Sequence, residues 1–385
     1  MTMPNRTQLL LGQPSWRLAS AEVEAWITQT GGHLGPVTFA LKRQKVQPFS
    51  VAPWAEERLD PDLPALLRAL RGDFFCLPFG GNGTPFRGEP HPPHGETANA
   101  PWTRVGAGQR DGRHWLHLQL EPRVRPGCVD KRLFLVDRQT AVYSEHTLAG
   151  MRGPMCLGHH PMLKFPPAAG SGVISTTPFI KGYVLPAPFE RAEDGGYYTL
   201  KSGAEFQALD QVPTLTGEMT DLSRFPARPG FDDLALLVSD TTAPFTWTAV
   251  TFPKEHYVWF SLKNPRQLRA TILWISNGGR HYPPWNGRHR CVMGLEEVTA
   301  FFHFGLAESA RKNFLSEQGI PTVVKLEPDR PLVVPFIQAM AAVPEGFDRV
   351  SAIEPEAGGV VLRSASGKAA RTPLSPEFLT ESPSW

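Results

Sequence analysis

Prolines and glycines are spread along the whole of this chain, and their frequency limits how it can fold. The 39 prolines and 35 glycines approach a fifth of the 385 residues. Proline breaks the interior of a helix and glycine weakens it, so long helices are not expected. Apolar residues make up 41% of the chain and aromatic residues 10%, which is too apolar for a disordered protein. The composition therefore predicts an all-β fold with many strands and only a few short helices.

Segments with strand patterns recur along most of the chain. Residues 22–27 alternate polar and apolar side chains, a Gly-Gly turn follows at 31–32, and residues 37–41 resume the pattern, which predicts a hairpin. Further strand patterns occur at residues 114–120, 132–137, 141–147, 172–177, 245–251, 257–262 and 268–275. This spacing indicates a large antiparallel sandwich or barrel rather than alternating β and α units.

Two segments have the spacing of a helix. Residues 62–70 begin with an N-cap aspartate, and residues 306–314 have apolar side chains at every fourth position before a glycine and a proline at 319–321. We expect one short helix in each segment and strands again within residues 322–353. The polar tail after residue 364 is expected to have a mobile end.

The charge of the chain is nearly balanced, with 39 basic and 37 acidic residues and no block of like charge. Nucleic-acid binding depends on clustered positive charge, so no nucleic-acid partner is expected. The N-terminal segment has an apolar run of only three leucines, whereas a secretory signal needs about 7–15 apolar residues. No segment approaches the roughly 20 apolar residues of a membrane span. We therefore expect a soluble, cytoplasmic protein with no membrane partner.

Neither the cysteines nor the histidines form a metal-binding pattern. The four cysteines lie far apart without a CxxC pair, and we expect them to be buried free thiols. His91 and His94 are separated by two prolines, and His159 and His160 are adjacent, so neither pair easily directs both rings to one ion. We expect no metal site and no other cofactor.

The stretch from Arg71 to Trp102 is unusually rich in special residues. It contains the arginine, a Phe-Phe-Cys-Leu run, glycine-rich turns and a His-Gly pair at His94. A surface loop does not need such a combination. Our hypothesis is that a β scaffold brings further polar residues to His94.

Three more positions are candidates for a site. Glu296 lies in an otherwise apolar run, where a carboxylate is either exposed at a strand end or held in a dry pocket with a raised pKa, as a general base requires. Asp232 and Asp233 precede an apolar run, where one of them is suited to cap a turn. Trp285 is either a core residue or, because its loop is rich in proline, glycine and asparagine, a flat face for a sugar ring or a partner.

These residues belong to a series of motifs that resembles the aldose 1-epimerase, or galactose mutarotase, family. The motifs occur in the family's order: RGDFFCLPFGG at 71–81, HG at 94–95, Trp102, GHHP at 158–161, GFDDLAL at 230–236 and CVMGLEEVT at 291–299. The resemblance covers roughly residues 20–305 and implies a large antiparallel β-supersandwich, which we expect over residues 1–305. Residues 306–385 are expected to form a C-terminal helix and strands that pack on the sandwich or extend it.

The resemblance implies an acid and base pair for opening a sugar ring. In the family, one histidine donates a proton to the ring oxygen and a late glutamate removes the proton from the anomeric hydroxyl; the matching positions are His160 and Glu296. Closing the ring needs the same groups with exchanged roles, so no cofactor is required. The hypothesis demands that these two side chains face each other across a pocket as wide as a sugar ring.

The resemblance also implies residues that hold the sugar, and the sequence departs from the family in three ways. The aromatic residues that follow the His-Pro step are missing. The Glu-Pro step is Glu-Glu at 296–297, which leaves open which carboxylate points into the site, because neighbours on a strand face opposite ways. The His-Gly motif lacks the arginine of the sugar-phosphate branch, so the sugar and its phosphorylation stay open. The substrate-binding candidates are Arg71, His94, Asp232 and, from its loop position, Trp285.

The sequence thus predicts an aldose 1-epimerase-like isomerase that interconverts the anomers of a small sugar or sugar derivative, as a monomer or a homodimer. The alternative is a non-catalytic carbohydrate-binding or sensing protein that uses the same cleft, with Trp274 and Trp285 as apolar faces. A polysaccharide lyase or glycosidase ranks last, because it would need a catalytic tyrosine or a second carboxylate. None of the six tyrosines adjoins a histidine motif.

Overall fold

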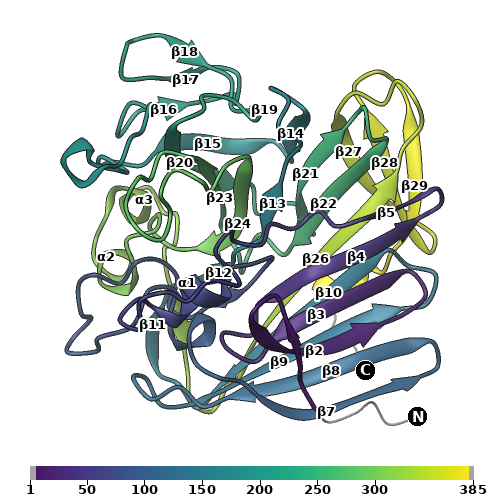
Figure 1. The fold of residues 1–385 in the computed structure, drawn as a ribbon, viewed down its shortest axis with the longest axis horizontal. Helices are drawn as coiled ribbons and strands as arrows, with labels where there is room; N and C mark the ends of the chain where they lie inside the picture. The colour runs from purple at the N-terminus through teal and green to yellow at the C-terminus, as the bar shows by residue number, and fades with distance from the viewer. Residues whose placement is uncertain (1–5, 381–385) are drawn as a thin grey trace.

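The computed structural model describes residues 6–380, which form two large antiparallel sheets and four smaller ones (Figure 1). The end of the C-terminal tail, for which we expected mobility, lies outside the described residues. The nine-stranded sheet has the order β19 (Arg224–Phe225), β14 (Gly172–Thr176), β21 (Thr246–Phe252), β22 (Tyr257–Lys263), β26 (Leu332–Ala342), β10 (Ala141–Ala149), β9 (Cys128–Val136), β8 (Arg113–Leu120) and β7 (Thr103–Arg110).

The eight-stranded sheet carries the residues of the site. Its order is β16 (Glu205–Phe206), β15 (Phe179–Val184), β20 (Phe231–Ser239), β23 (Ala270–Asn277), β24 (Val292–Thr299), β12 (Leu157–His159) and β6 (Phe75–Cys76), and β13 (Met162–Lys164) also pairs with β24. The short pairs are β11 (Gly153–Met155) with β25 (Val324–Leu326) and β17 (Val212–Pro213) with β18 (Met219–Thr220).

The two ends of the chain each add a smaller sheet. The N-terminal sheet consists of β1 (Gln8–Leu10), β2 (Gln13–Ala19), β3 (Val23–Thr28), β4 (Leu34–Leu41) and β5 (Gln44–Val46). The C-terminal sheet consists of β27 (Val350–Glu356), β28 (Gly359–Ser364) and β29 (Ala369–Pro373). The predicted hairpin is confirmed by the antiparallel pairing of β3 with β4, and each of the other seven predicted strand segments overlaps a strand.

Strand β26 shows how the layers are held together. It lies in the middle of the nine-stranded sheet, between β22 and β10. Phe336 and Met340 point into the large core between the sheets, whereas Ile337 and Ala339 point into a second core under the C-terminal sheet. Side chains on a strand alternate between its faces, so a mostly apolar run, broken in β26 only by Gln338, suits a strand covered on both sides.

Three short helices lie at one side of the sheets (Figure 1): α1 (Ala65–Ala69), α2 (Leu306–Ala310) and α3 (Phe314–Glu317). The prediction of a single helix over 306–314 is wrong, because the chain becomes extended at Arg311 and Asn313 starts a new helix. The side chain of Asn313 accepts a hydrogen bond from the backbone N–H of Ser316, which is the role of an N-cap residue. Within residues 6–380, no helix has both the length and the apolar composition needed to cross a membrane.

Candidate active site

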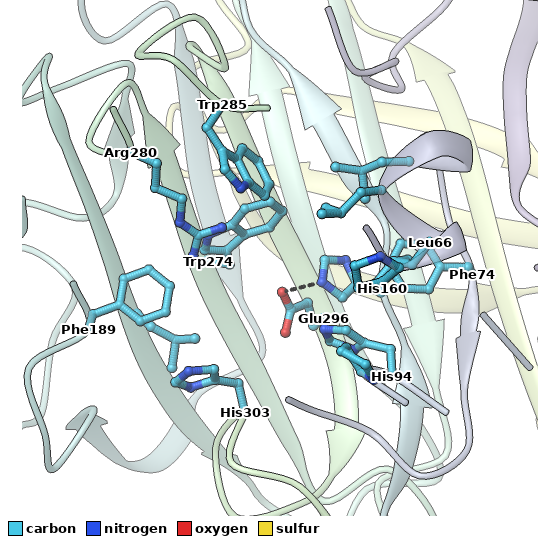
Figure 2. Close-up of a pocket in the computed structure, with 15 residues that line it drawn as sticks. Leu66, Phe74, His94, His160, Phe189, Trp274, Arg280, Trp285, Glu296 and His303 are labelled. Carbon is cyan, nitrogen blue, oxygen red and sulfur yellow. Dashed lines mark ion pairs between the residues drawn. The ribbon is translucent and has the colours of Figure 1, made fainter. Parts of the chain in front are cut away.

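A pocket of about 230 Å³ lies beside β12 and β24 and receives side chains from distant parts of the chain (Figure 2). Ligand pockets generally hold roughly 300–1,000 Å³, so this one suits a single small molecule rather than a chain of sugars. It is lined by Pro64, Leu66, Leu67, Leu70, Phe74, Pro93, His94, His160, Phe189, Leu234, Trp274, Arg280, Trp285, Glu296 and His303.

The pairing of β12 with β24 brings His160 and Glu296 together. His159 is paired with Glu297 in this antiparallel ladder, so the next positions, His160 and Glu296, share the opposite face. Nε2 of His160 lies 3.0 Å from Oε1 of Glu296, and both side chains are almost completely buried (Figure 2). The His160 ring is stacked on Phe74, with 4.5 Å between the ring centroids.

Burial sets the protonation of this pair. It raises the pKa of Glu296 well above its usual range, with only the charge of Arg280 opposing the shift. It also lowers the pKa of His160 to about 3. Both shifts disfavour the charged forms, so near neutral pH the two side chains hold one proton between them and are not a fully charged ion pair.

The sequence hypothesis placed His160 and Glu296 on opposite walls of the pocket. The structure instead brings the two side chains into direct contact. Contact is compatible with ring opening, because the anomeric oxygen and the ring oxygen are bonded to the same carbon. The acid and the base for these two oxygens must therefore lie next to each other.

Glu297 faces away from the pocket, which settles the choice that the Glu-Glu step left open. Its carboxylate forms an ion pair with Lys263 and accepts hydrogen bonds from the hydroxyls of Thr248 and Thr271 at 2.6 and 2.7 Å. All of these groups lie in the interior between the sheets. Glu296 is thus the carboxylate available to a ligand.

His94 reaches the pocket from the loop that precedes β7. Its ring lies edge-on to His160, with centroids 5.0 Å apart, and its Nδ1 lies 3.3 Å from Sγ of Cys76. The next residue, Gly95, has a φ of 76°, and a Cβ there would meet the carbonyl oxygen of Leu77 at 1.9 Å. Only glycine permits this approach, so Gly95 allows the turn of the backbone that directs His94 into the pocket.

Trp285 lines the pocket, and a cation lies over its ring. The guanidinium carbon of Arg280 is 4.6 Å from the centroid of Trp285 and 5.4 Å from that of Trp274. Trp285 also meets Trp54 edge-on at 4.9 Å. The tryptophan therefore fixes Arg280 at the pocket and is not a bare platform for a sugar ring.

Asp232 does not line the pocket, although the sequence made it a candidate for holding the sugar. Its carboxylate accepts hydrogen bonds from the hydroxyl of Ser276 and from the backbone N–H groups of Asn277 and Gly279. It also lies 3.6 Å from Nε of Arg280. Its place behind the guanidinium makes Asp232 a positioning residue for Arg280.

Arg71 lies outside the pocket, so its candidacy as a substrate-binding residue is corrected. The side chain is fully buried and donates hydrogen bonds to the backbone carbonyls of Ala69, Leu10 and Leu11. Burial lowers the pKa of its guanidinium to about 10. Arg71 ties the N-terminal strand β1 to the end of α1, because its guanidinium donates to backbone carbonyls of both.

Arg280, His303 and Phe189 are pocket residues that the sequence reasoning missed. Arg280 is held by Glu190, whose Oε1 lies 2.6 Å from its Nε. Burial opposes the charge of Arg280, but the carboxylates of Glu190 and Asp232 outweigh it and raise the pKa of the guanidinium. A lone arginine in a glycine- and proline-rich loop carries no local signal; the glycine pair before it was the only hint of a special turn.

The cysteines form no disulfide bond, and the described residues contain no cluster of metal-binding side chains. All four cysteines are free; Cys76 and Cys156 are buried as expected, whereas Cys128 and Cys291 are partly exposed. Among residues 6–380, no group of three or more His, Cys, Asp and Glu side chains is arranged to hold a metal ion.

No family model matches the sequence, and no curated protein matches it. Solved structures match over most of the chain. An aldose epimerase homologue from C. elegans is 14% identical, with 86% of this chain and 100% of that chain covered and a TM-score of 0.56. A galactose mutarotase related enzyme from Lactobacillus acidophilus is 11% identical, with 86% of this chain and 99% of that chain covered and a TM-score of 0.53. A galactose mutarotase-like protein from Clostridium acetobutylicum is 11% identical, with 88% of this chain and 98% of that chain covered and a TM-score of 0.54. The chain therefore has the galactose mutarotase-like β-sandwich fold.

Proposed function

We propose that this protein interconverts the anomers of a small sugar by opening and reclosing its ring, as an aldose 1-epimerase does. The observation that carries the proposal is the buried contact between Nε2 of His160 and Oε1 of Glu296 in a pocket that suits one sugar ring. The fold of the mutarotase-related structures supports it, and so does the order of the site motifs along the chain.

The protonation of the pair supports its use as an acid and a base. A contact pair that holds one proton can place that proton on His160 and leave Glu296 as a carboxylate when a substrate hydroxyl replaces the contact. The carboxylate then accepts the proton of the anomeric hydroxyl. His160 donates the shared proton to the ring oxygen.

The bond changes balance without a cofactor. As Glu296 takes the proton from the anomeric hydroxyl, the C1–O1 bond becomes a carbonyl and the C1–O5 bond breaks. The electron pair of that bond stays on O5, which takes the proton from Nε2 of His160. Rotation about the C1–C2 bond presents the other face of the aldehyde, and the same two groups, with roles exchanged, close the ring to the other anomer.

Arg280 and His94 supply the remaining polar contacts. Among the described residues, the side-chain hydrogen bond of Arg280 is donated by Nε to Glu190, and Asp232 lies nearest to the same nitrogen. The terminal nitrogens of the guanidinium therefore are available to sugar hydroxyls. Because two carboxylates already balance its charge, Arg280 suits neutral hydroxyls better than a phosphate or a second carboxylate.

A non-catalytic carbohydrate-binding or sensing protein is the second candidate. The many apolar and aromatic side chains that line the pocket favour it, because small-molecule binding sites are lined mostly by such side chains with a few polar groups. Under this alternative His160 and Glu296 would hold a sugar without exchanging protons with it.

Saturation-transfer NMR on the α and β anomers of aldoses separates the two candidates. The isomerase predicts faster anomer exchange with the wild-type protein, and His160→Ala or Glu296→Gln slows it by about 10²–10⁴-fold each. Calorimetry on the same variants shows whether a sugar still binds. Binding without any acceleration of exchange would assign the pocket to a binding protein.

A further inference from the structure

The polar groups of the pocket are unevenly distributed (Figure 2). Arg280 and His303 lie on the side of Glu296, together with Trp274 and Phe189. On the side of His160 lie Phe74 and Leu66, and Leu66 belongs to α1. This helix and its ends also contribute Pro64, Leu67 and Leu70 to the lining, so they form an apolar wall with Phe74.

The apolar wall is held in place by hydrogen bonds to its backbone. The indole N–H of Trp54 donates to the carbonyl of Leu67 at 2.8 Å, and the N–H of Leu66 donates to the side-chain oxygen of Asn99 at 2.9 Å. Helix α1 therefore presents a fixed surface to a ligand and does not need to close over it.

The proposed chemistry fixes which part of a sugar meets this wall. A sugar that presents O5 to His160 and O1 to Glu296 has C5 beyond O5, on the His160 side of the pocket. The substituent on C5, which is a hydroxymethyl group in a hexose, then lies toward Phe74 and Leu66. The hydroxyl on C4 lies on the same side.

Only one polar side chain among the lining residues serves that side. His94 has its Nδ1 beside Sγ of Cys76, which leaves Nε2 as the ring nitrogen that is free for a ligand. One nitrogen can bind the hydroxyl on C4 or the hydroxyl on C6, but not both. A hydroxyl buried without a partner lowers affinity, whereas a methyl group in the same place gains from burial.

We propose that the pocket selects 6-deoxyaldoses, which carry a methyl group on C5, over the corresponding hexoses. This inference rests on the function proposed above, because that function supplies the orientation of the ring. His94 serves the hydroxyl on C4, and the apolar wall covers the methyl group.

Two matched sugar series test the selection through kcat/KM for anomer exchange. D-galactose, D-fucose and L-arabinose share one ring configuration and carry a hydroxymethyl group, a methyl group and a hydrogen on C5. D-glucose, 6-deoxy-D-glucose and D-xylose form the second series. We expect kcat/KM for the 6-deoxy sugar to be at least tenfold higher than for its hexose, whose C6 hydroxyl is buried without a partner. We expect it to be about fourfold higher than for the pentose, which is the gain from burying one methyl group.

The outcomes separate this inference from the proposed function. Anomer exchange with hexoses equal to or faster than 6-deoxy sugars would overturn the selection and leave the isomerase intact. Tighter binding of 6-deoxy sugars in saturation-transfer difference NMR, without faster exchange, would overturn the isomerase and leave the selection intact. No binding and no exchange with all six sugars would overturn both.

A substitution in the wall gives a second test. Leu66→Gln adds an amide that can bind the C6 hydroxyl, so the preference for the 6-deoxy sugar should fall at least fivefold, whereas the apolar control Leu66→Met should keep it. Circular dichroism melting checks that the variants fold. Leu67→Gln, at a half-buried position of the same wall, replaces Leu66→Gln if that variant does not fold. An unchanged preference in a folded glutamine variant would contradict the assignment of the wall.

Discussion

Glu296 and Glu297 are neighbours in the chain, yet their carboxylates lie on opposite faces of β24 and in different surroundings. Glu296 faces the pocket and contacts His160, whereas Glu297 faces the interior and forms an ion pair with Lys263. One residue is thus available for chemistry, and the other neutralises a buried cation.

The first prediction concerns the stability of the interior pair. Glu297→Gln leaves the ammonium of Lys263 without a counter-charge in a buried site, so the free energy of unfolding should fall by about 3–5 kcal/mol. Urea unfolding followed by circular dichroism measures this. Glu296→Gln is the matched control and should change the free energy by less than about 1 kcal/mol; equal losses in the two variants would contradict the different roles.

The second prediction is that the protein loses stability in acid from near pH 6.5 downward. Burial lowers the pKa of His33, His160 and His289 to about 3 and of His303 to about 4. In the unfolded chain these histidines bind protons near pH 6.5, whereas in the folded protein they stay neutral at that pH. The free energy of unfolding therefore falls as the pH drops below 6.5. The raised pKa of Glu296 acts in the opposite direction, but it offsets one such group only.

Urea unfolding at pH 7.5 and 5.5 measures this dependence, and His146→Phe is its internal check. His146 is fully buried, its ring is stacked on Phe75 at 4.0 Å, and neither ring nitrogen has a hydrogen-bond partner among residues 6–380. Burial, together with the charge of Lys131, lowers its pKa well below the usual range. The variant should lose about 1.4 kcal/mol less than the wild type between the two pH values. The same loss in both proteins would rule out a neutral His146 in the fold.

The third prediction distinguishes a structural Arg71 from a substrate-binding one. Arg71→Met removes the donor from one buried and two partly buried backbone carbonyls, so the free energy of unfolding should fall by at least about 2 kcal/mol. KM should stay within about twofold of the wild type, because the guanidinium lies outside the pocket. Arg17→Met, which breaks an exposed pair with Glu24, is the control for loss of an arginine and should cost at most about 1 kcal/mol. A raised KM at unchanged stability would return Arg71 to the site.

The fourth prediction concerns Asp232 as a positioning residue. Asp232→Asn removes one of the two carboxylates that balance Arg280, so the guanidinium loses its fixed place at the pocket. We expect KM to rise about tenfold and kcat to change by less than about threefold, because Arg280 contacts the sugar and not the transferred protons. Asp233→Asn is the matched control. The Asp233 carboxylate accepts hydrogen bonds from the backbone N–H groups of Thr199 and Leu200, so this substitution should reduce stability without changing KM. A fall in kcat alone for Asp232→Asn would place Asp232 in the chemistry.

Much of the architecture could be predicted from the sequence, because its signals are local. The alternation of side chains at residues 22–27 and the turn at 31–32 specify a hairpin wherever the chain lies. The helix expected over 306–314 failed for a local reason as well: Asn313 competes for backbone hydrogen bonds and starts a second helix, which apolar spacing alone does not reveal.

The sequence by itself determined the β fold, the motif order and the identity of the residues that meet at the centre of the site, His94, His160 and Glu296. Only the tertiary structure decided that Arg71 braces the N-terminal strand, that Asp232 acts through Arg280, and that Glu296 rather than Glu297 reaches the pocket. The physical reason is that a polar side chain takes its role from the partners it meets after folding. Those partners, here the carbonyls around Arg71 and the rings around Arg280, come from segments that no local pattern connects.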